Sequence, residues 1–282
     1  MIRLLSINWN VDPVLFDLGL IQIRYYSICW VLCFYVSYII FRQIFKKENL
    51  KRELLDKLTI NYVIPFTFIG ARLGHCLFYE GAYYLKYPWE IILPFHDGKF
   101  IGYAGLASHG AAFGILFALW LFCRKYKKTY IWSLDRIAIA VPVAGAIVRF
   151  GNLMNSEVYG HTTDLPWGFV FVRAGETSPA HPTQIYEMLA YLLLFVVLYY
   201  LFFKKDLGIK KPGVIFGIFL IGLFTARFLI EFVKQNQVEF EEQMSLNMGQ
   251  WLSLPFIITG AVILVFCLLN KISVNDKYGK TK

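Results

Sequence analysis

The chain has 282 residues, of which 57% are hydrophobic and 18% aromatic, and its formal net charge is +9. A soluble protein of this length does not need so much apolar surface, so this composition excludes an ordinary soluble enzyme. A basic charge can indicate nucleic-acid binding, but the basic residues gather in the polar connections between long apolar stretches. Anionic lipid attracts charges at such places, so we expect membrane lipids and no nucleic acid as partners.

The apolar stretches predict an all-α integral membrane protein with seven transmembrane helices. Each stretch approaches or exceeds the roughly 20 residues that cross a bilayer as a helix. We expect a single polytopic membrane domain over residues 1–282. The predicted spans are about 21–41, 60–79, 107–123, 137–153, 183–203, 213–233 and 249–269.

The connections between these spans alternate between rich and poor in lysine and arginine. Basic residues mark the cytoplasmic side of a membrane protein, so this pattern predicts an N-terminus outside and a C-terminus in the cytoplasm. The long connection 155–181 then forms a small outer, or periplasmic, head, in which a turn precedes a short predicted strand at 167–172. The basic-rich connections are 42–57, 124–128, 204–211 and the tail from residue 271.

Ionisable residues inside membrane spans are candidates for function, because insertion into a bilayer opposes them. Combined with the topology, their positions predict that several of them lie at one depth, just beneath the outer surface. We therefore expect a shared site there rather than separate structural ion pairs. The residues that converge at this depth are Arg72, His75, His109, Arg149, Arg227 and Glu231.

Arg149 indicates an anionic ligand, because a guanidinium stays charged at any ordinary pH and its fork matches phosphate oxygens. Asn152 lies three residues further on and can share its helix face. The arginines outnumber the nearby carboxylates, so we predict an external anion, and a phospholipid head group is abundant at this depth. The alternative for Arg227 is an ion pair with Glu231 on the same helix face, which would neutralise it.

His109 is the candidate base, because an unperturbed histidine has a pKa near 6.5 and suits proton transfer. A helix cap or a core position is the alternative role. At 181–187 we favour a structural role, with Pro182 in the first turn of a helix and with Gln184 and Glu187 facing the interior. The five cysteines have no metal-binding spacing, and we expect neither a metal nor a cofactor.

Seven segments together carry a family resemblance that covers nearly the whole chain. They are 24–27, 70–74, 108–110, 149–160, 181–187, 227–232 and 248–250. The chain closely resembles the prolipoprotein diacylglyceryl transferase family, and the segment 149–160 is the most specific match. The resemblance implies seven transmembrane helices, an outer N-terminus and a small periplasmic head, in agreement with the topology above.

The resemblance also implies a transferase of lipoprotein biosynthesis in the bacterial cytoplasmic (inner) membrane, with its active site near the outer leaflet. The sn-1,2-diacylglyceryl group of phosphatidylglycerol passes to the lipobox cysteine thiol of a preprolipoprotein signal peptide. A thioether forms and glycerol 1-phosphate leaves. Catalytic roles fall to His109, Arg149 and Arg227, and substrate binding to Tyr26, Arg149, Asn152, Glu157, Gly160, Arg227 and Glu231.

Two other functional classes are consistent with arginines in a membrane. A transporter or flippase for an anionic lipid or metabolite predicts inverted repeats or broken helices near the midplane, and no repeat is visible. A phosphatidyl- or glycosyl-phosphate transferase usually holds a metal with several intramembrane aspartates. The only aspartate near the start of a span is Asp135, on the predicted cytoplasmic side.

Overall fold

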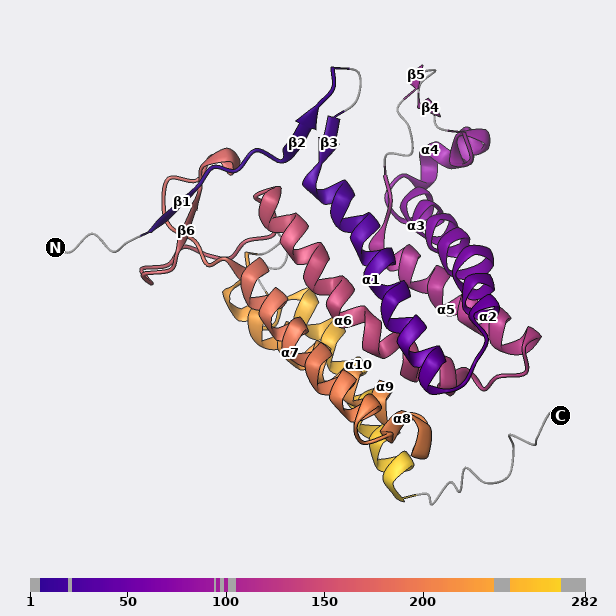
Figure 1. Ribbon diagram of the computed structural model, residues 1–282. Helices are drawn as coiled ribbons and strands as arrows, with labels where there is room; N and C mark the ends of the chain where they lie inside the picture. The colour runs from indigo at the N-terminus through magenta and orange to yellow at the C-terminus, as the bar shows by residue number, and fades with distance from the viewer. Residues whose placement is uncertain are drawn as a thin grey trace. The chain divides into compact units, whose positions relative to one another are not determined.

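The computed structural model describes residues 6–19, 22–93, 95–96, 99–100, 105–235 and 244–269. It is predominantly helical (Figure 1). The chain divides into two compact units, which are described separately: unit 1 comprises Met1–Phe41 and Asp135–Lys282, and unit 2 comprises Arg42–Leu134. The expected single polytopic domain remains a prediction.

Five described helices are long and apolar enough to cross a membrane, judged by length and composition. Large hydrophobic side chains such as Val31, Leu193 and Val262 are about two-thirds exposed on them, as lipid-facing positions require. Helices therefore form at five of the seven predicted spans, with ends that differ by a few residues. They are α1 (Tyr25–Lys47), α6 (Tyr130–Met154), α7 (Thr183–Phe203), α9 with its terminal 3-10 turn η4 (Val214–Val233) and α10 (Met248–Leu269).

The other two predicted spans, 60–79 and 107–123, also form helices, but the first is too short and the second is not apolar enough to count as a candidate span. The first is α3 (Ile64–Phe78), whose 15 residues follow a π-helical turn η1 (Thr59–Val63). The second is α5 (Ser108–Lys125), which ends in two basic residues. The arrangement with seven spans therefore remains a prediction.

In unit 2, α3 and α5 pack with their backbones in close contact. A Cβ atom on Gly110 of α5 would overlap the carbonyl oxygen of Gly70 on α3, and one on Gly74 would lie 2.7 Å from Cα of Gly110. Small residues four apart allow this kind of helix contact. The shorter elements of unit 2 are α2 (Arg52–Leu58), α4 (Gly81–Lys86), η2 (Pro88–Ile91), β4 (Phe95–His96) and β5 (Lys99–Phe100).

In unit 1, α9 packs against both α7 and α10. The fully buried Asp135 on α6 accepts hydrogen bonds from the backbone N–H groups of Gly213 (2.7 Å) and Phe216 (2.9 Å). It thereby satisfies donors at the start of α9 that have no partner within the helix. A short helix, α8 (Leu207–Lys210), precedes this start.

The connection 155–181, called the head below, packs with the described residues near the N-terminus; its position on the outer side remains a prediction. Strand β6 (Phe169–Phe171) confirms the strand predicted at 167–172, and it pairs in parallel with β1 (Ile7–Trp9). The indole Nε1 of Trp9 donates to the Leu153 carbonyl at the end of α6 (2.9 Å). The other elements here are η3 (Val172–Ala174) and the antiparallel pair β2 (Val14–Asp17) and β3 (Gln22–Arg24).

We predict that Gly110→Ala destabilises the protein by about 2 kcal/mol, because the added methyl group must force the α3 and α5 backbones apart. Thermal unfolding in detergent measures the effect. Gly81→Ala is the matched control, since its Cβ would meet nothing closer than 4.0 Å. Equal melting temperatures for the two variants would refute the close packing.

Candidate active site

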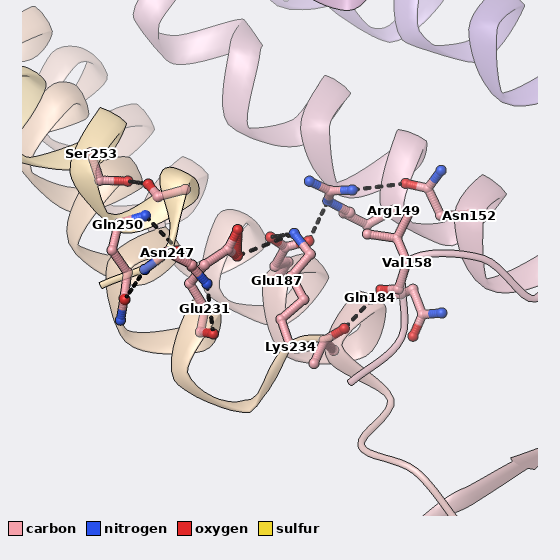
Figure 2. Close-up of polar contacts among 12 residues, drawn as sticks. Arg149, Asn152, Val158, Gln184, Glu187, Glu231, Lys234, Asn247, Gln250 and Ser253 are labelled. Atoms are coloured by element: carbon pink, nitrogen blue, oxygen red, sulfur yellow. Dashed lines mark hydrogen bonds and ion pairs between the residues drawn. The ribbon is translucent and has the colours of Figure 1, made fainter. Parts of the chain in front are cut away.

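The centre of the site in unit 1 is an ion pair between Arg149 on α6 and Glu187 on α7. The Arg149 Nε atom contacts the Glu187 carboxylate, as Figure 2 shows. The Glu187 side chain is fully buried, whereas the Arg149 side chain remains 18% exposed. One edge of the guanidinium is therefore fixed by a buried carboxylate, and part of the group stays accessible.

Asn152 links Arg149 to a second carboxylate. The Arg149 Nη1 atom donates to Oδ1 of Asn152 (3.0 Å), and Nδ2 of Asn152 donates to Oε1 of Glu157 (2.7 Å). Asn155 also donates to this oxygen, at 3.4 Å. Glu157 thus orients the amide group that in turn holds Arg149, and the predicted alignment of Arg149 and Asn152 on one helix face is confirmed.

Tyr26, in the first turn of α1, adjoins the same group of side chains. A Cβ atom on Gly151 would lie 2.9 Å from the Tyr26 ring, so this glycine lets the ring approach α6. The Tyr26 hydroxyl lies within electrostatic range of Arg149 and Glu157. The fold therefore brings Tyr26 together with three other predicted site residues.

Lys234, directly after η4, connects this group to the end of α9. Its side chain is only 3% exposed, and its Nζ atom lies 3.5 Å from Oε1 of Glu187 and 3.4 Å from Oε2 of Glu231 (Figure 2). Both contacts are longer than the 2.7–2.9 Å typical of a tight charged hydrogen bond. The ammonium is therefore shared between the two carboxylates.

Arg227 does not pair with Glu231. Among the described residues no ion pair joins them, and the buried Nε atom of Arg227 has no hydrogen-bond acceptor. The structural ion pair that the sequence allowed is therefore absent from this part of the chain. The hydroxyl of Tyr191, one turn beyond Glu187, lies within electrostatic range of Glu187, Arg149 and Arg227, which places the two arginines in one neighbourhood.

Gly160 allows the head to pack against the segment that carries Lys234. A Cβ atom on Gly160 would overlap the carbonyl oxygen of Val233, and the neighbouring His161 donates its N–H to that oxygen (2.9 Å). The N–H of Gly160 donates to the His181 carbonyl (2.8 Å). Gly160 is thus required for packing beside the site, while its predicted contact with substrate remains a prediction.

The start of α10 explains the motif at 248–250. Asn247 and Gln250 cap this helix reciprocally: the N–H of Asn247 donates to the Gln250 side chain (3.0 Å), and the N–H of Gln250 to the Asn247 side chain (2.9 Å). Gly249 is needed because a Cβ there would overlap the Glu231 carboxylate. This motif therefore makes room for Glu231.

Two titratable groups of the connection 155–181 have clear pKa shifts. Burial, together with a 2.7 Å hydrogen bond to Glu176, raises the pKa of Tyr159 to about 12, so this phenol stays protonated at neutral pH. Burial and the neighbouring His161 lower the pKa of His181, whose Nδ1 atom lies 3.2 Å from the Tyr186 hydroxyl. A neutral, partnered His181 fits the structural role expected for it.

His109 and Arg72 belong to unit 2 and differ in their surroundings. His109 is exposed in the first turn of α5 and has no hydrogen bond or ion pair with the described residues. Arg72 is buried and donates to the carbonyls of Glu90 (2.7 Å), Ile91 (3.1 Å) and Gly105 (3.5 Å). Through these hydrogen bonds Arg72 holds the chain that precedes α5 in place. The convergence of His109 with Arg149 remains a prediction.

Sequence reasoning missed two members of the site. Glu187 was expected to face the interior, which is confirmed, but its role as the partner of Arg149 was not predicted. Lys234 is not among the candidates from the sequence, although its position three residues after Glu231 places both on one helical face. Among the described residues no group of histidine, cysteine or acidic side chains could hold a metal ion.

The fold and site together define a class of protein: predominantly helical, with five described helices suited to cross a membrane, and with a cluster of buried ion pairs built around arginine. A model of the family described as prolipoprotein diacylglyceryl transferase matches residues 13–266. The chain therefore belongs to the prolipoprotein diacylglyceryl transferase family.

Individual relatives match over nearly their whole length. The phosphatidylglycerol–prolipoprotein diacylglyceryl transferase of Bacteroides fragilis is 46% identical over 268 residues, which cover 93% of this chain and 96% of the relative. The proteins of the same name from Tolumonas auensis and Porphyromonas gingivalis are 40% and 39% identical. These alignments cover 93% and 95% of this chain, and 98% and 96% of the two relatives.

We predict that Glu187→Gln lowers the free energy of unfolding by about 3 kcal/mol, because it leaves two largely buried cations without their shared carboxylate. Chemical or thermal unfolding in detergent measures this loss. The control is Asp206→Asn, which removes an exposed ion pair to Lys210 and should cost less than about 1 kcal/mol. Similar losses in both variants would contradict the central role of Glu187.

Proposed function

We propose that this protein transfers the diacylglyceryl group of phosphatidylglycerol to the lipobox cysteine thiol of preprolipoproteins. The transfer forms a thioether and releases glycerol 1-phosphate. The observation that carries the proposal is the state of Arg149: a guanidinium fixed on one edge by a buried carboxylate and still partly exposed. It lies in the segment 149–160, which carries the most specific resemblance in the sequence and falls within the residues that the family model matches.

The arginines act on the phosphate. Sulfur displaces a phosphate ester from a glycerol carbon, so negative charge grows on the departing phosphate. Preorganised cations in a site that excludes water stabilise such charge strongly. We assign this role to Arg149 and Arg227, because Arg149 is anchored and the buried Nε atom of Arg227 has no acceptor among the described residues.

The residues around Arg149 bind and orient the head group. Asn152 and Glu157 hold the Arg149 side chain in place, and Tyr26 lies within electrostatic range of the same guanidinium. Gly160 keeps the head close to the end of α9, and Glu231 balances the charge of Lys234 there. These contacts fix the direction of the guanidinium fork before lipid binds, which lowers the cost of ordering the complex.

His109 is the proposed base for the cysteine thiol. A free thiol has a pKa of about 8.5 and reacts as the thiolate, so a proton acceptor favours the attack. His109 is exposed, and no described residue engages its side chain, which leaves the imidazole free to accept a proton directly or through water. Its place beside the arginines is part of the proposal.

The bacterial cytoplasmic membrane is the proposed location, with seven spans in one polytopic domain, the N-terminus outside and the head at 155–181 on the outer side. This places Arg149 near the head groups of the outer leaflet. A transporter or flippase would instead favour broken helices near the midplane. The five candidate spans are continuous, even where α6 and α10 contain Pro142 and Pro255.

We expect Arg149→Ala to reduce transfer at least a thousandfold, since it removes a preorganised charge from the reacting phosphate. The assay incubates purified enzyme with phosphatidylglycerol and a lipobox peptide and follows the gain of one diacylglyceryl unit by mass spectrometry. Arg173→Ala, which removes an exposed arginine paired with Asp12 in the head, should retain activity. Near-normal turnover by Arg149→Ala would exclude the phosphate role.

His109→Gln should lower kcat by about a hundredfold at pH 6–7, with part of the loss recovered at pH 9, where more of the peptide thiol is ionised without a base. The rate of transfer is measured from pH 6 to 9 in both proteins. If the variant keeps most of its activity across this range, the base lies elsewhere.

A further inference from the structure

Among the described charged residues of this site, Lys234 lies outside the family motifs and has no role in the proposed reaction. It comes from the segment after η4, and its side chain is almost completely buried. Burying an ammonium is costly unless anionic groups compensate it. Here Glu187 and Glu231 compensate it from two different elements (Figure 2).

The two carboxylates that hold Lys234 are also the ones best placed to neutralise the arginines. Glu187 already contacts Arg149 through its other oxygen, and Glu231 lies four residues after Arg227 on the same helical face. An arginine fully paired with a carboxylate presents little net charge to a phosphate. Without Lys234, each arginine would have a carboxylate to itself.

In the structure Glu231 pairs with Lys234, whereas Glu187 is shared between Lys234 and Arg149, with Arg149 the closer of the two cations. Oε1 of Glu187 faces the ammonium while Oε2 faces Arg149, so one negative charge is divided between two cations. Glu231 faces Lys234 as well, and it has no ion pair with Arg227 among the described residues. Gly249 secures this position, because the Glu231 carboxylate occupies the space that a Cβ there would take.

We infer that Lys234 is a positioning residue that keeps Arg149 and Arg227 available to the lipid phosphate. It pairs with Glu231 and shares Glu187 with Arg149, and these are the two carboxylates that would otherwise neutralise the arginines. It acts through Glu187 and Glu231 and does not touch the substrate. This inference rests on the proposed phosphate role of the two arginines.

The test measures KM for phosphatidylglycerol and kcat with a lipobox peptide in mixed micelles, using the full-length enzyme. Lys234→Met keeps the length of the side chain but removes its charge. It should raise KM about tenfold and lower kcat as well, because the same arginines bind the lipid phosphate and stabilise its departure. Lys234→Arg restores the charge and should keep KM within about threefold of the native value. Lys234→Gln is a second neutral variant, and its polar side chain is better suited than methionine to a buried position beside carboxylates.

The decisive variant is Lys234→Met combined with Glu231→Gln. In this double variant the side chain at position 231 is neutral and cannot pair with Arg227. KM should therefore be lower than in Lys234→Met alone by about threefold or more. If Lys234 has only a structural role, KM should instead be higher in the double variant than in Lys234→Met, because the effects of two lost native contacts at one place would add. The same pairing with Lys234→Gln repeats the test if the methionine variant does not fold.

An unchanged KM in the neutral variants, or a double variant that is worse than the single one, would overturn the inference. Failure of the underlying function gives a different result, because the native protein would then form no diacylglyceryl peptide at all. Thermal unfolding of each variant in detergent separates loss of fold from loss of lipid binding.

Discussion

The burial of the Glu187 carboxylate is the constraint on which the rest of the site depends. A carboxylate with no exposed surface requires compensating charge, and α7 itself supplies no basic residue. Arg149 from α6 and Lys234 from the end of α9 provide this charge from two sides. Three elements that are distant in the sequence are thereby held at one place by electrostatics, and Arg149 is fixed before any substrate arrives.

Small residues around this centre allow charged groups and backbones to come close. Gly151 admits the Tyr26 ring, Gly160 admits the Val233 carbonyl, and Gly249 admits the Glu231 carboxylate. In each case a Cβ atom would occupy the space of a neighbouring group. The glycines of the family motifs are therefore needed to make space in this fold, independently of any contact with lipid. The positions of the charged residues depend on these glycines.

The sequence predicted much of the helical framework, because long apolar stretches are recognisable from composition alone. Helices formed at each of the seven predicted spans, and five of them have the length and composition to cross a membrane. The pairing of β1 with β6 could not be predicted, since the two strands lie about 160 residues apart and a three-residue strand has no periodic signal of its own. The start of α3 at Ile64 and the hydrogen bonds from Arg72 to backbone carbonyls were likewise seen only in the structure.

The sequence by itself determined the local features of the chain. These are the apolar stretches, the arginines and acidic residues within or beside them, and the spacing that aligns Arg149 with Asn152 on one helix face. Helical periodicity fixes such neighbours, because it acts within one element. The choice of partners was decided by tertiary structure. Arg149 pairs with Glu187 across two helices, and Glu231 with Lys234 rather than with Arg227, since the balance of buried charge depends on which helices pack together.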